Sequence, residues 1–104
     1  MIEVDLKDIT VDSFRPYVGH TFQFLDEATG TQVALELAEM EEKRFKAASS
    51  DHREPFSLFF RGPEKFYRPQ GIHVLEHSEM GRLKVFMVPL QPDEKGSLYQ
   101  VVFN

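Results

Sequence analysis

The chain has no cysteine among its 104 residues. This absence excludes disulfides, thiolate zinc sites, cysteine-ligated iron–sulfur clusters and cysteine nucleophiles. Small secreted domains often depend on disulfides, so the absence favours a reducing compartment, and we expect a cytoplasmic protein. No apolar run approaches the roughly 18 residues that a membrane span needs, and the acidic N-terminal segment has no signal-peptide pattern.

Basic residues are also scarce, since 12 Lys and Arg stand against 17 Asp and Glu, for a formal net charge of -5. Without a long basic stretch, neither nucleic acid nor an anionic membrane is an expected partner. The sequence also lacks a glycine-rich phosphate loop and a recognisable pair of catalytic carboxylates, so we expect no cofactor and no enzyme activity. The chain is instead rich in phenylalanine, with 10 Phe and no Trp. Phe buries a large area without a polar tip, which is typical of core packing.

Short alternating segments predict β-strands along most of the chain. The clearest is the segment after Pro55, where Phe56, Leu58 and Phe60 share one strand face before Gly62-Pro63 forces a turn. Five other segments show strand patterns: Thr21–Leu25, Gln32–Leu37, Ile72–Glu76, Leu83–Val88 and Leu98–Phe103. The stretch Pro89–Gly96 is predicted to be a turn region.

Two segments of the chain favour helix. Thr10 is expected to cap a short helix over Val11–Val18, whose length Pro16 limits. Ala38–Ser50 is ambiguous, because its Glu, Lys and Arg residues favour helix, whereas the preceding strand can also continue through Met40.

About six strands at short spacing, with only one short helix, indicate an all-β fold. We expect a single domain over residues 1–104, built as a small antiparallel barrel or sandwich with a short N-terminal helix. No segment long enough for crossover helices is present, so parallel pairing is disfavoured.

A histidine pair is the first candidate for a chemical site. His73 and His77 have a spacing that suits zinc binding on a helix. In a strand the two residues stand about 13 Å apart, too far for one metal ion. We therefore favour a solvent-facing His73 and a His77 that anchors a turn.

Two polar stretches are further candidates. Asp51–Glu54 combines an acid, a histidine and a cation in a predicted loop, next to Ser49 and Ser50. These serines lack the G-x-S-x-G context of a nucleophile elbow, so a solvated loop is favoured over a catalytic site. The acidic run Glu36, Glu39, Glu41 and Glu42 lacks calcium-loop spacing, which indicates a solvated face or, as the alternative, an acidic docking patch.

The candidate protein interface is an aromatic and cationic loop. Phe66, Tyr67 and Arg68 lie in a connection rich in Pro and Gly, and with Arg61 they form our predicted binding residues. Tyr and Arg are enriched at protein interfaces. In the other interpretation, Phe66 plugs one end of a barrel while Tyr67 tethers the loop.

The last strand offers a second route to association. If Val101–Phe103 lies at a sheet edge, its backbone can pair with a second copy of the chain or with another protein. The alternative is that the strand pairs internally and closes the sheet.

Several motifs resemble a small bacterial family of single-domain proteins of about this length. They include G-H-T-F from Gly19, P-F-S-L-F-F-R-G-P from Pro55, F-M-V-P from Phe86 and Y-Q-V-V-F-N from Tyr99. The family has no established activity, so the resemblance transfers no catalytic residue. It implies an accessory or assembly role beside phage-tail-like components.

We therefore expect a non-catalytic protein-interaction or assembly-accessory module with an unidentified protein partner. The alternative is a small-molecule binder or enzyme with its site in the barrel mouth. That alternative needs a concave pocket on which polar groups converge from His20, His73, Arg61 or Tyr99. A core completely filled by phenylalanines would exclude it.

Overall fold

The computed structural model describes residues 2–42 and 55–104, and within them a short N-terminal helical segment precedes six strands. The helical segment holds the 3-10 turn η1 (Leu6–Asp8), helix α1 (Val11–Phe14) and the 3-10 turn η2 (Arg15–Tyr17). The strands are β1 (Thr21–Leu25), β2 (Gln32–Glu42), β3 (Phe56–Gly62), β4 (Gly71–His77), β5 (Gly81–Asp93) and β6 (Gly96–Phe103).

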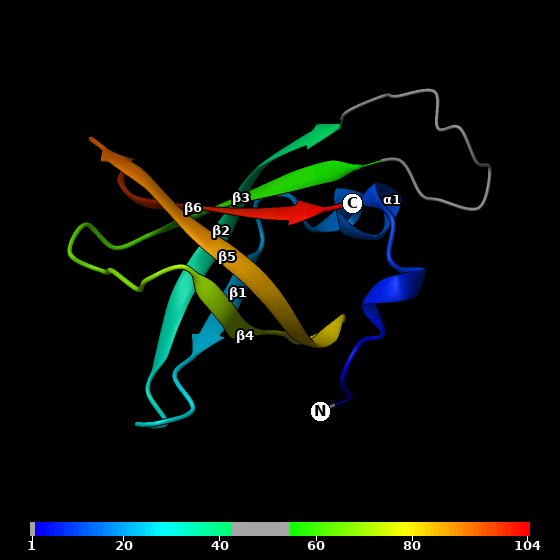
Figure 1. Cartoon of the computed structure of the whole chain (residues 1–104), viewed down its shortest axis with the longest axis horizontal. Helices are drawn as coiled ribbons and strands as arrows, with labels where there is room; N and C mark the ends of the chain where they lie inside the picture. Colours follow the sequence, from blue (N-terminus) through cyan, green and yellow to red (C-terminus); the bar gives the residue numbers. More distant parts are fainter. Residues whose placement is uncertain (1, 43–54) are drawn as a thin grey trace.

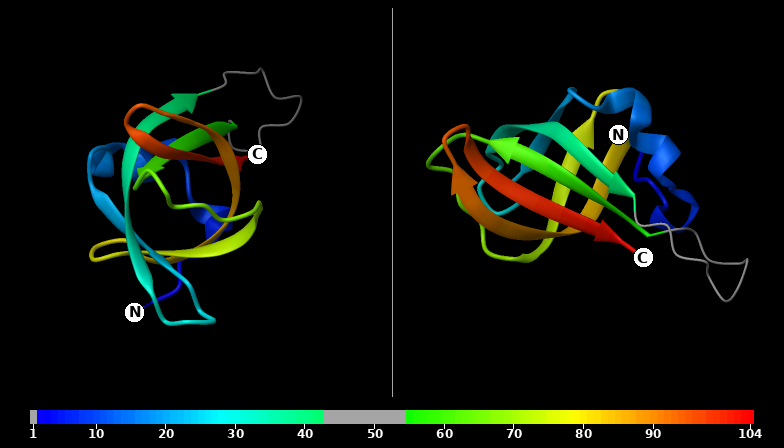
Figure 2. Two further views of the ribbon diagram at one scale, coloured as in Figure 1. Left: turned by 90° about the vertical axis from the view of Figure 1, so that its left-hand side faces the viewer. Right: turned by 90° about the horizontal axis from the view of Figure 1, so that it is seen from above.

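The six strands close into an antiparallel barrel in the order β1-β2-β3-β6-β5-β4, with β4 returning to β1 (Figures 1 and 2). Two three-stranded meanders, β1–β3 and β4–β6, are joined along β3–β6 and β1–β4. The predicted all-β class is confirmed, and of its two alternatives the barrel is the one formed. The last strand pairs internally, because Val101 faces Leu58 of β3 on one side and Met87 of β5 on the other.

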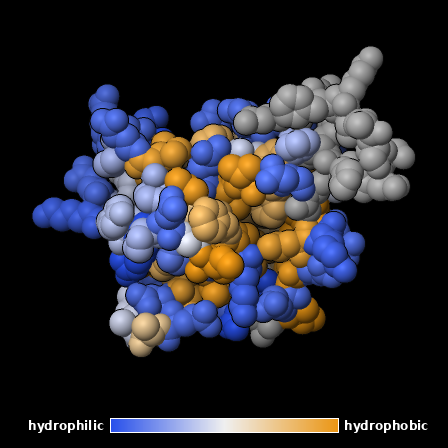
Figure 3. Space-filling view, viewed as in Figure 1, coloured by the Kyte–Doolittle hydropathy of each residue, from blue (hydrophilic) through white to orange (hydrophobic). Residues whose placement is uncertain are grey.

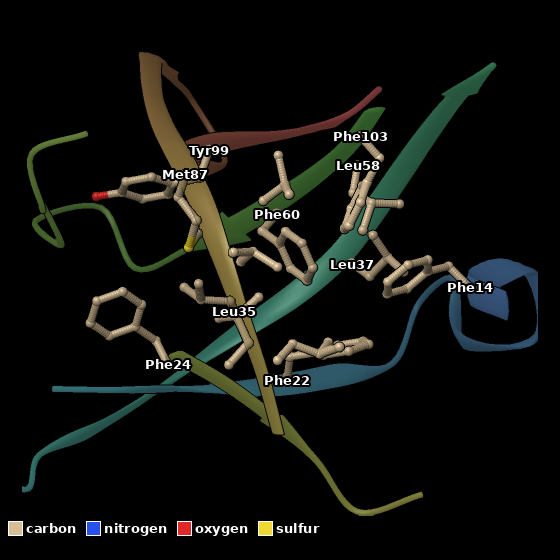
Figure 4. Packing of buried hydrophobic residues seen from close by; sticks show 14 of the residues in the cluster. Phe14, Phe22, Phe24, Leu35, Leu37, Leu58, Phe60, Met87, Tyr99 and Phe103 are labelled. Carbon is tan, nitrogen blue, oxygen red and sulfur yellow. The ribbon is translucent and has the colours of Figure 1, made fainter. Parts of the chain in front are cut away.

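The interior of the barrel is filled by aromatic and branched side chains (Figure 4). The predicted inward face of β3 is confirmed, since Phe56, Leu58 and Phe60 are all buried. Phe60 meets Phe22 of β1 edge to face, with ring centroids 5.3 Å apart. Aromatic pairs in this geometry add to the stabilisation from buried area.

Each end of the barrel is closed by a phenylalanine from outside the sheet. At one end Phe14 of α1 lies 5.7 Å from the ring of Phe103, which in turn stacks on Phe56 at 4.6 Å. At the other end Phe66 of the loop between β3 and β4 lies 5.1 Å from Phe24. Figure 4 shows Phe14 and Phe24 at opposite ends of the core.

The structure shortens the predicted N-terminal helix and decides between the two interpretations of the segment after Leu37 as far as Glu42. The N-terminal helix is shorter than predicted, because the chain tightens into η2 around Pro16, which has no N–H for the helical ladder. In the ambiguous segment, residues as far as Glu42 continue β2 and pair with β3. A register shift after Leu37 accommodates Ala38 as a bulge, which turns Glu39 and Glu41 outward.

Strand β5 also runs further than predicted, through Pro89 and Pro92 to Asp93. Among the described residues β4 accompanies β5 only as far as Met87, so the prolines lie where β5 pairs with β6 alone. The β5–β6 turn then closes on Gly96 at φ +127°, where an added Cβ would stand 2.2 Å from the carbonyl oxygen of Gly62.

The Gly96→Ala substitution is expected to destabilise the fold strongly. Ala at this position meets both an unfavourable φ and a backbone oxygen, so we expect a loss of about 3 kcal/mol or more in the free energy of unfolding. Gly30→Ala is the matched control, because Gly30 also has positive φ but nothing lies within 4 Å of its added Cβ. Urea unfolding of both variants measures the difference in the free energy of unfolding. Equal losses in the two variants would contradict a steric role for the close approach between Gly96 and Gly62.

The Phe60→Ala substitution tests the inward face of β3. Because Phe60 is fully buried, we expect a loss of about 3–5 kcal/mol in the free energy of unfolding. Phe59→Ala on the partly exposed opposite face is the control and should cost clearly less. Thermal and urea unfolding of the two variants measure the difference. An unchanged midpoint for Phe60→Ala would contradict the assignment of Phe60 to the core-facing side of β3.

Candidate functional site

The four predicted interface residues come together at one end of the barrel. Arg61 faces Leu98 across β3 and β6 and forms an ion pair with Asp93 of the β5–β6 hairpin. Phe66, Tyr67 and Arg68 lie in the loop that covers the same end. Arg61 precedes this loop on β3, and the pairing of β3 with β6 places it beside the β5–β6 hairpin.

Phe66 acts as the plug that the second interpretation predicted. Its ring is half-buried and packs against Phe24 and, at 5.5 Å, against Tyr99. The guanidinium of Arg68 lies 4.9 Å from the centre of the Phe66 ring and 3.4 Å from the carboxylate of Asp26. In this position the Arg68 guanidinium contacts the face of the Phe66 ring and also forms its ion pair with Asp26.

The side chain that tethers the loop is Tyr99, and the expectation that Tyr67 would do so is wrong. The Tyr99 hydroxyl accepts a hydrogen bond from the backbone N–H of Arg68 at 2.8 Å and donates one to the carbonyl of Phe66 at 3.3 Å. Burial raises the pKa of this hydroxyl, so it stays protonated and keeps its donor. The side chain of Tyr67 is 64% exposed instead.

A pocket of about 120 Å³ lies between this loop and the β5–β6 hairpin. Its lining includes Phe66, Tyr67, Pro92, Ser97, Leu98 and Tyr99. Of the four polar residues predicted to converge on a barrel mouth, Tyr99 lines this pocket. His73 lines a second pocket beside Arg68 and Ile72.

The histidines form a different arrangement from a metal site. His77 anchors the β4–β5 turn, as predicted, because its Nδ1 accepts hydrogen bonds from the backbone N–H groups of Glu79 and Met80 at 3.1 and 3.2 Å. His73 is half-buried rather than solvent-facing, with its ring 5.1 Å from that of Phe24 and its Nε2 2.9 Å from the carbonyl oxygen of Pro69. Within residues 2–42 and 55–104 no three His, Cys, Asp or Glu side chains gather to hold a metal ion.

The hydrogen-bond network assigns the tautomer of His77. Since Nδ1 accepts two backbone hydrogen bonds, the neutral ring carries its proton on Nε2, which donates to Nδ1 of His20 at 3.3 Å. The buried ring is packed between Tyr17 and Phe22, each 4.6 Å away between ring centroids. Desolvation, with a smaller contribution from His20, lowers the pKa of His77, while the Glu79 carboxylate acts weakly in the opposite direction.

We expect the free energy of unfolding to fall as the pH is lowered through about 6.5, the ordinary pKa of histidine. The unfolded chain takes up a proton there that the folded, neutral His77 resists, so protonation favours unfolding. In His77→Asn the side-chain oxygen can still accept the turn's N–H groups but cannot titrate.

Urea unfolding of wild type and His77→Asn at pH 5 and pH 7 measures this pH dependence. The variant should lose less stability between the two pH values than wild type does. Ser78→Ala, in the turn that His77 anchors, is the control, because it removes no titrating group and should keep the wild-type pH dependence. If His77→Asn also keeps it in full, another group is responsible.

The outer face of the second meander carries an apolar row that sequence reasoning missed. Ile72, Phe86 and Val102, on β4, β5 and β6, are 72%, 52% and 46% exposed. Ile72 and Phe86 are direct cross-strand partners, and Val102 lies one residue beyond the Met87–Val101 pair. Figure 3 shows apolar side chains gathered on the face over β5. The sequence signal that could have predicted this row is that both alternating faces of β5 contain large apolar residues.

The remaining two sequence candidates have different outcomes. The stretch Asp51–Glu54, with Ser49 and Ser50, lies outside the described residues. In the acidic run, Glu36, Glu39 and Glu41 are exposed on β2, while Glu42 forms an ion pair with Arg15.

Among the described helices, none has the length and apolar character to cross a membrane.

Comparison with known proteins adds a family but no activity. Residues 9–103 match the family described as "Domain of unknown function (DUF6916)". The chain belongs to the DUF6916 family. The match covers the whole barrel and α1, so the predicted resemblance to a family without established activity is confirmed at that level. No curated protein and no solved structure matches the DUF6916 chain.

Proposed function

We propose that this DUF6916 protein is a non-catalytic protein-interaction module that binds a partner protein through the apolar row Ile72, Phe86 and Val102. The observation that carries the proposal is the exposure of these three side chains on adjacent strands. Large apolar side chains grouped on a surface and bordered by polar residues are typical of interaction sites.

The surroundings of the row resemble the anatomy of a protein interface. Lys84 of β5 borders it on one side, exposed and 3.6 Å from Glu3, and the partly buried Gln100 of β6 lies on the other. Apolar groups at the centre with polar groups at the rim are the usual arrangement in specific interfaces. Ile72 also lines a pocket with Arg68, which connects the row to the interface residues predicted from the sequence.

Recognition in this proposal uses side chains rather than backbone. The last strand has β3 and β5 as neighbours, so it does not offer its edge to a partner. Self-association in this proposal uses the apolar row.

The cellular setting of the proposal follows from the resemblance and the composition. We place the protein in the bacterial cytoplasm, as an accessory to the assembly of phage-tail-like components. Its partner is a protein, because the excess of acidic over basic residues disfavours nucleic acid and anionic membranes.

Differential affinity capture tests the proposed function. Wild type, the double variant Ile72→Ser/Phe86→Ser and the control Val18→Ser are immobilised and exposed to lysate of the source cells, with bound proteins quantified by mass spectrometry. Val18 is also exposed but precedes β1, outside the row. We expect a protein that binds wild type and Val18→Ser at similar levels and the double variant at least tenfold less.

Sedimentation of the same three proteins distinguishes a second copy of the chain from a different partner. A wild-type dimer that the double variant loses assigns the row to self-association. Equal capture of the same proteins by all three baits, after circular dichroism has shown that each is folded, would refute the proposed interface.

A further inference from the structure

The apolar row belongs to a wider apolar face on the outside of the barrel. Val88 and Leu90 continue the outer side of β5 beyond Phe86, and Leu98 of β6 is the cross-strand partner of Leu90. Phe59 of β3 and Val88 of β5 flank the same residue of β6 from opposite sides. These additional side chains are partly exposed. We call them, together with the row, the apolar face.

One border of the apolar face is acidic. On β2, Glu39 and Glu41 are the direct cross-strand partners of Phe59 and Ser57 on β3. The surface therefore changes from apolar to acidic within one strand spacing, about 4.8 Å. Both glutamates are exposed, and within residues 2–42 and 55–104 neither forms an ion pair. The Ser57 hydroxyl already accepts a hydrogen bond from Gln100 at 3.2 Å.

Four basic side chains on the same strands and in the adjoining loop have acidic partners. The ion pairs are Arg61 with Asp93, Arg68 with Asp26, Arg82 with Glu76, and Lys84 with Glu3. Each of these cations is compensated by its own carboxylate, whereas the two glutamates of β2 are not. A partner thus meets uncompensated negative charge at the β2 border, which favours Lys or Arg at that position of the partner.

We propose that the partner presents a chain segment in which large apolar side chains are followed by Lys or Arg. The apolar side chains cover the apolar face, and the cations contact Glu39 and Glu41. This inference rests on the proposed function, whose interface it extends from the row to β2. Two strand spacings separate Val102 from Glu41 and three separate Val88 from Glu39, a distance of about 10 to 14 Å. An extended segment covers this distance in about three to four residues.

Two synthetic peptides are the probes for this inference. The basic peptide alternates Leu and Ser over about six residues and ends in Lys-Ser-Lys, and the acidic peptide has Glu in place of Lys. Titration of the isotope-labelled protein, followed by amide chemical shifts, gives the location and the affinity of binding. We expect the basic peptide to bind about fivefold more tightly, with saturable shifts on β3, β5 and β6. Raising the salt concentration should reduce this difference.

Charge reversal at the acidic border is the deciding variant. In Glu39→Lys/Glu41→Lys the order of the two affinities should invert, so that the acidic peptide binds more tightly than the basic one. Asp8→Lys/Glu79→Lys is the matched control, because it changes the net charge equally at two exposed positions outside the strands. This control should keep the wild-type order. Circular dichroism first establishes that each variant is folded.

The outcomes separate this inference from the proposed function. The inference is overturned if neither peptide gives saturable shifts, if both bind wild type equally, or if charge reversal leaves their order unchanged. Equal binding of both peptides that Ile72→Ser/Phe86→Ser abolishes would overturn the basic partner and still support the row as the interface. Wild-type affinity of this double variant for the basic peptide would overturn both proposals.

Discussion

Closure of the barrel between β1 and β4 is the constraint on which the other features depend. A closed sheet has no free edges, and its interior must be filled because an empty apolar space loses dispersion contacts. The phenylalanine-rich composition meets that requirement, with Phe22, Phe24 and Phe60 buried inside. Binding surfaces are consequently confined to the outside of the strands and to the two ends of the barrel.

The two ends of the barrel are closed in different ways. At the α1 end, Phe14 packs against the stacked pair of Phe56 and Phe103. At the opposite end, Phe66 is held by a loop that hydrogen-bonds to the Tyr99 hydroxyl. A small pocket lies beside Phe66 at this end. The row on β4–β6 and this pocket are thus separate features of one meander.

Strands were predictable wherever the alternation of apolar and polar residues agreed with turn-forming residues at the strand ends. The inward face of β3 and the bounds of β1 followed from the sequence, because period-two patterns report directly on the two sides of a strand. The extension of β2 to Glu42 could not be separated from a helix, although continuation through Met40 was one of the two interpretations, and the extension of β5 to Asp93 was not predicted, since helix propensity and proline are local signals. Antiparallel pairing with the next strand in the sequence, β3 for β2 and β6 for β5, overrides both signals.

The sequence by itself determined the all-β class, the phenylalanine core and the position of an aromatic and cationic loop, because these depend on composition and on short-range periodicity. Only the tertiary structure decided that Tyr99 holds that loop, that the buried Ser97 hydroxyl has no hydrogen-bond partner within residues 2–42 and 55–104, and that Ile72, Phe86 and Val102 form one exposed row. The surroundings of Tyr99 and Ser97 depend on the pairing of β6 with β3, which is distant in the chain, and the row depends on the register of the consecutive strands β4, β5 and β6. Register is set when the barrel closes, and a one-residue change in pairing would separate these groups again.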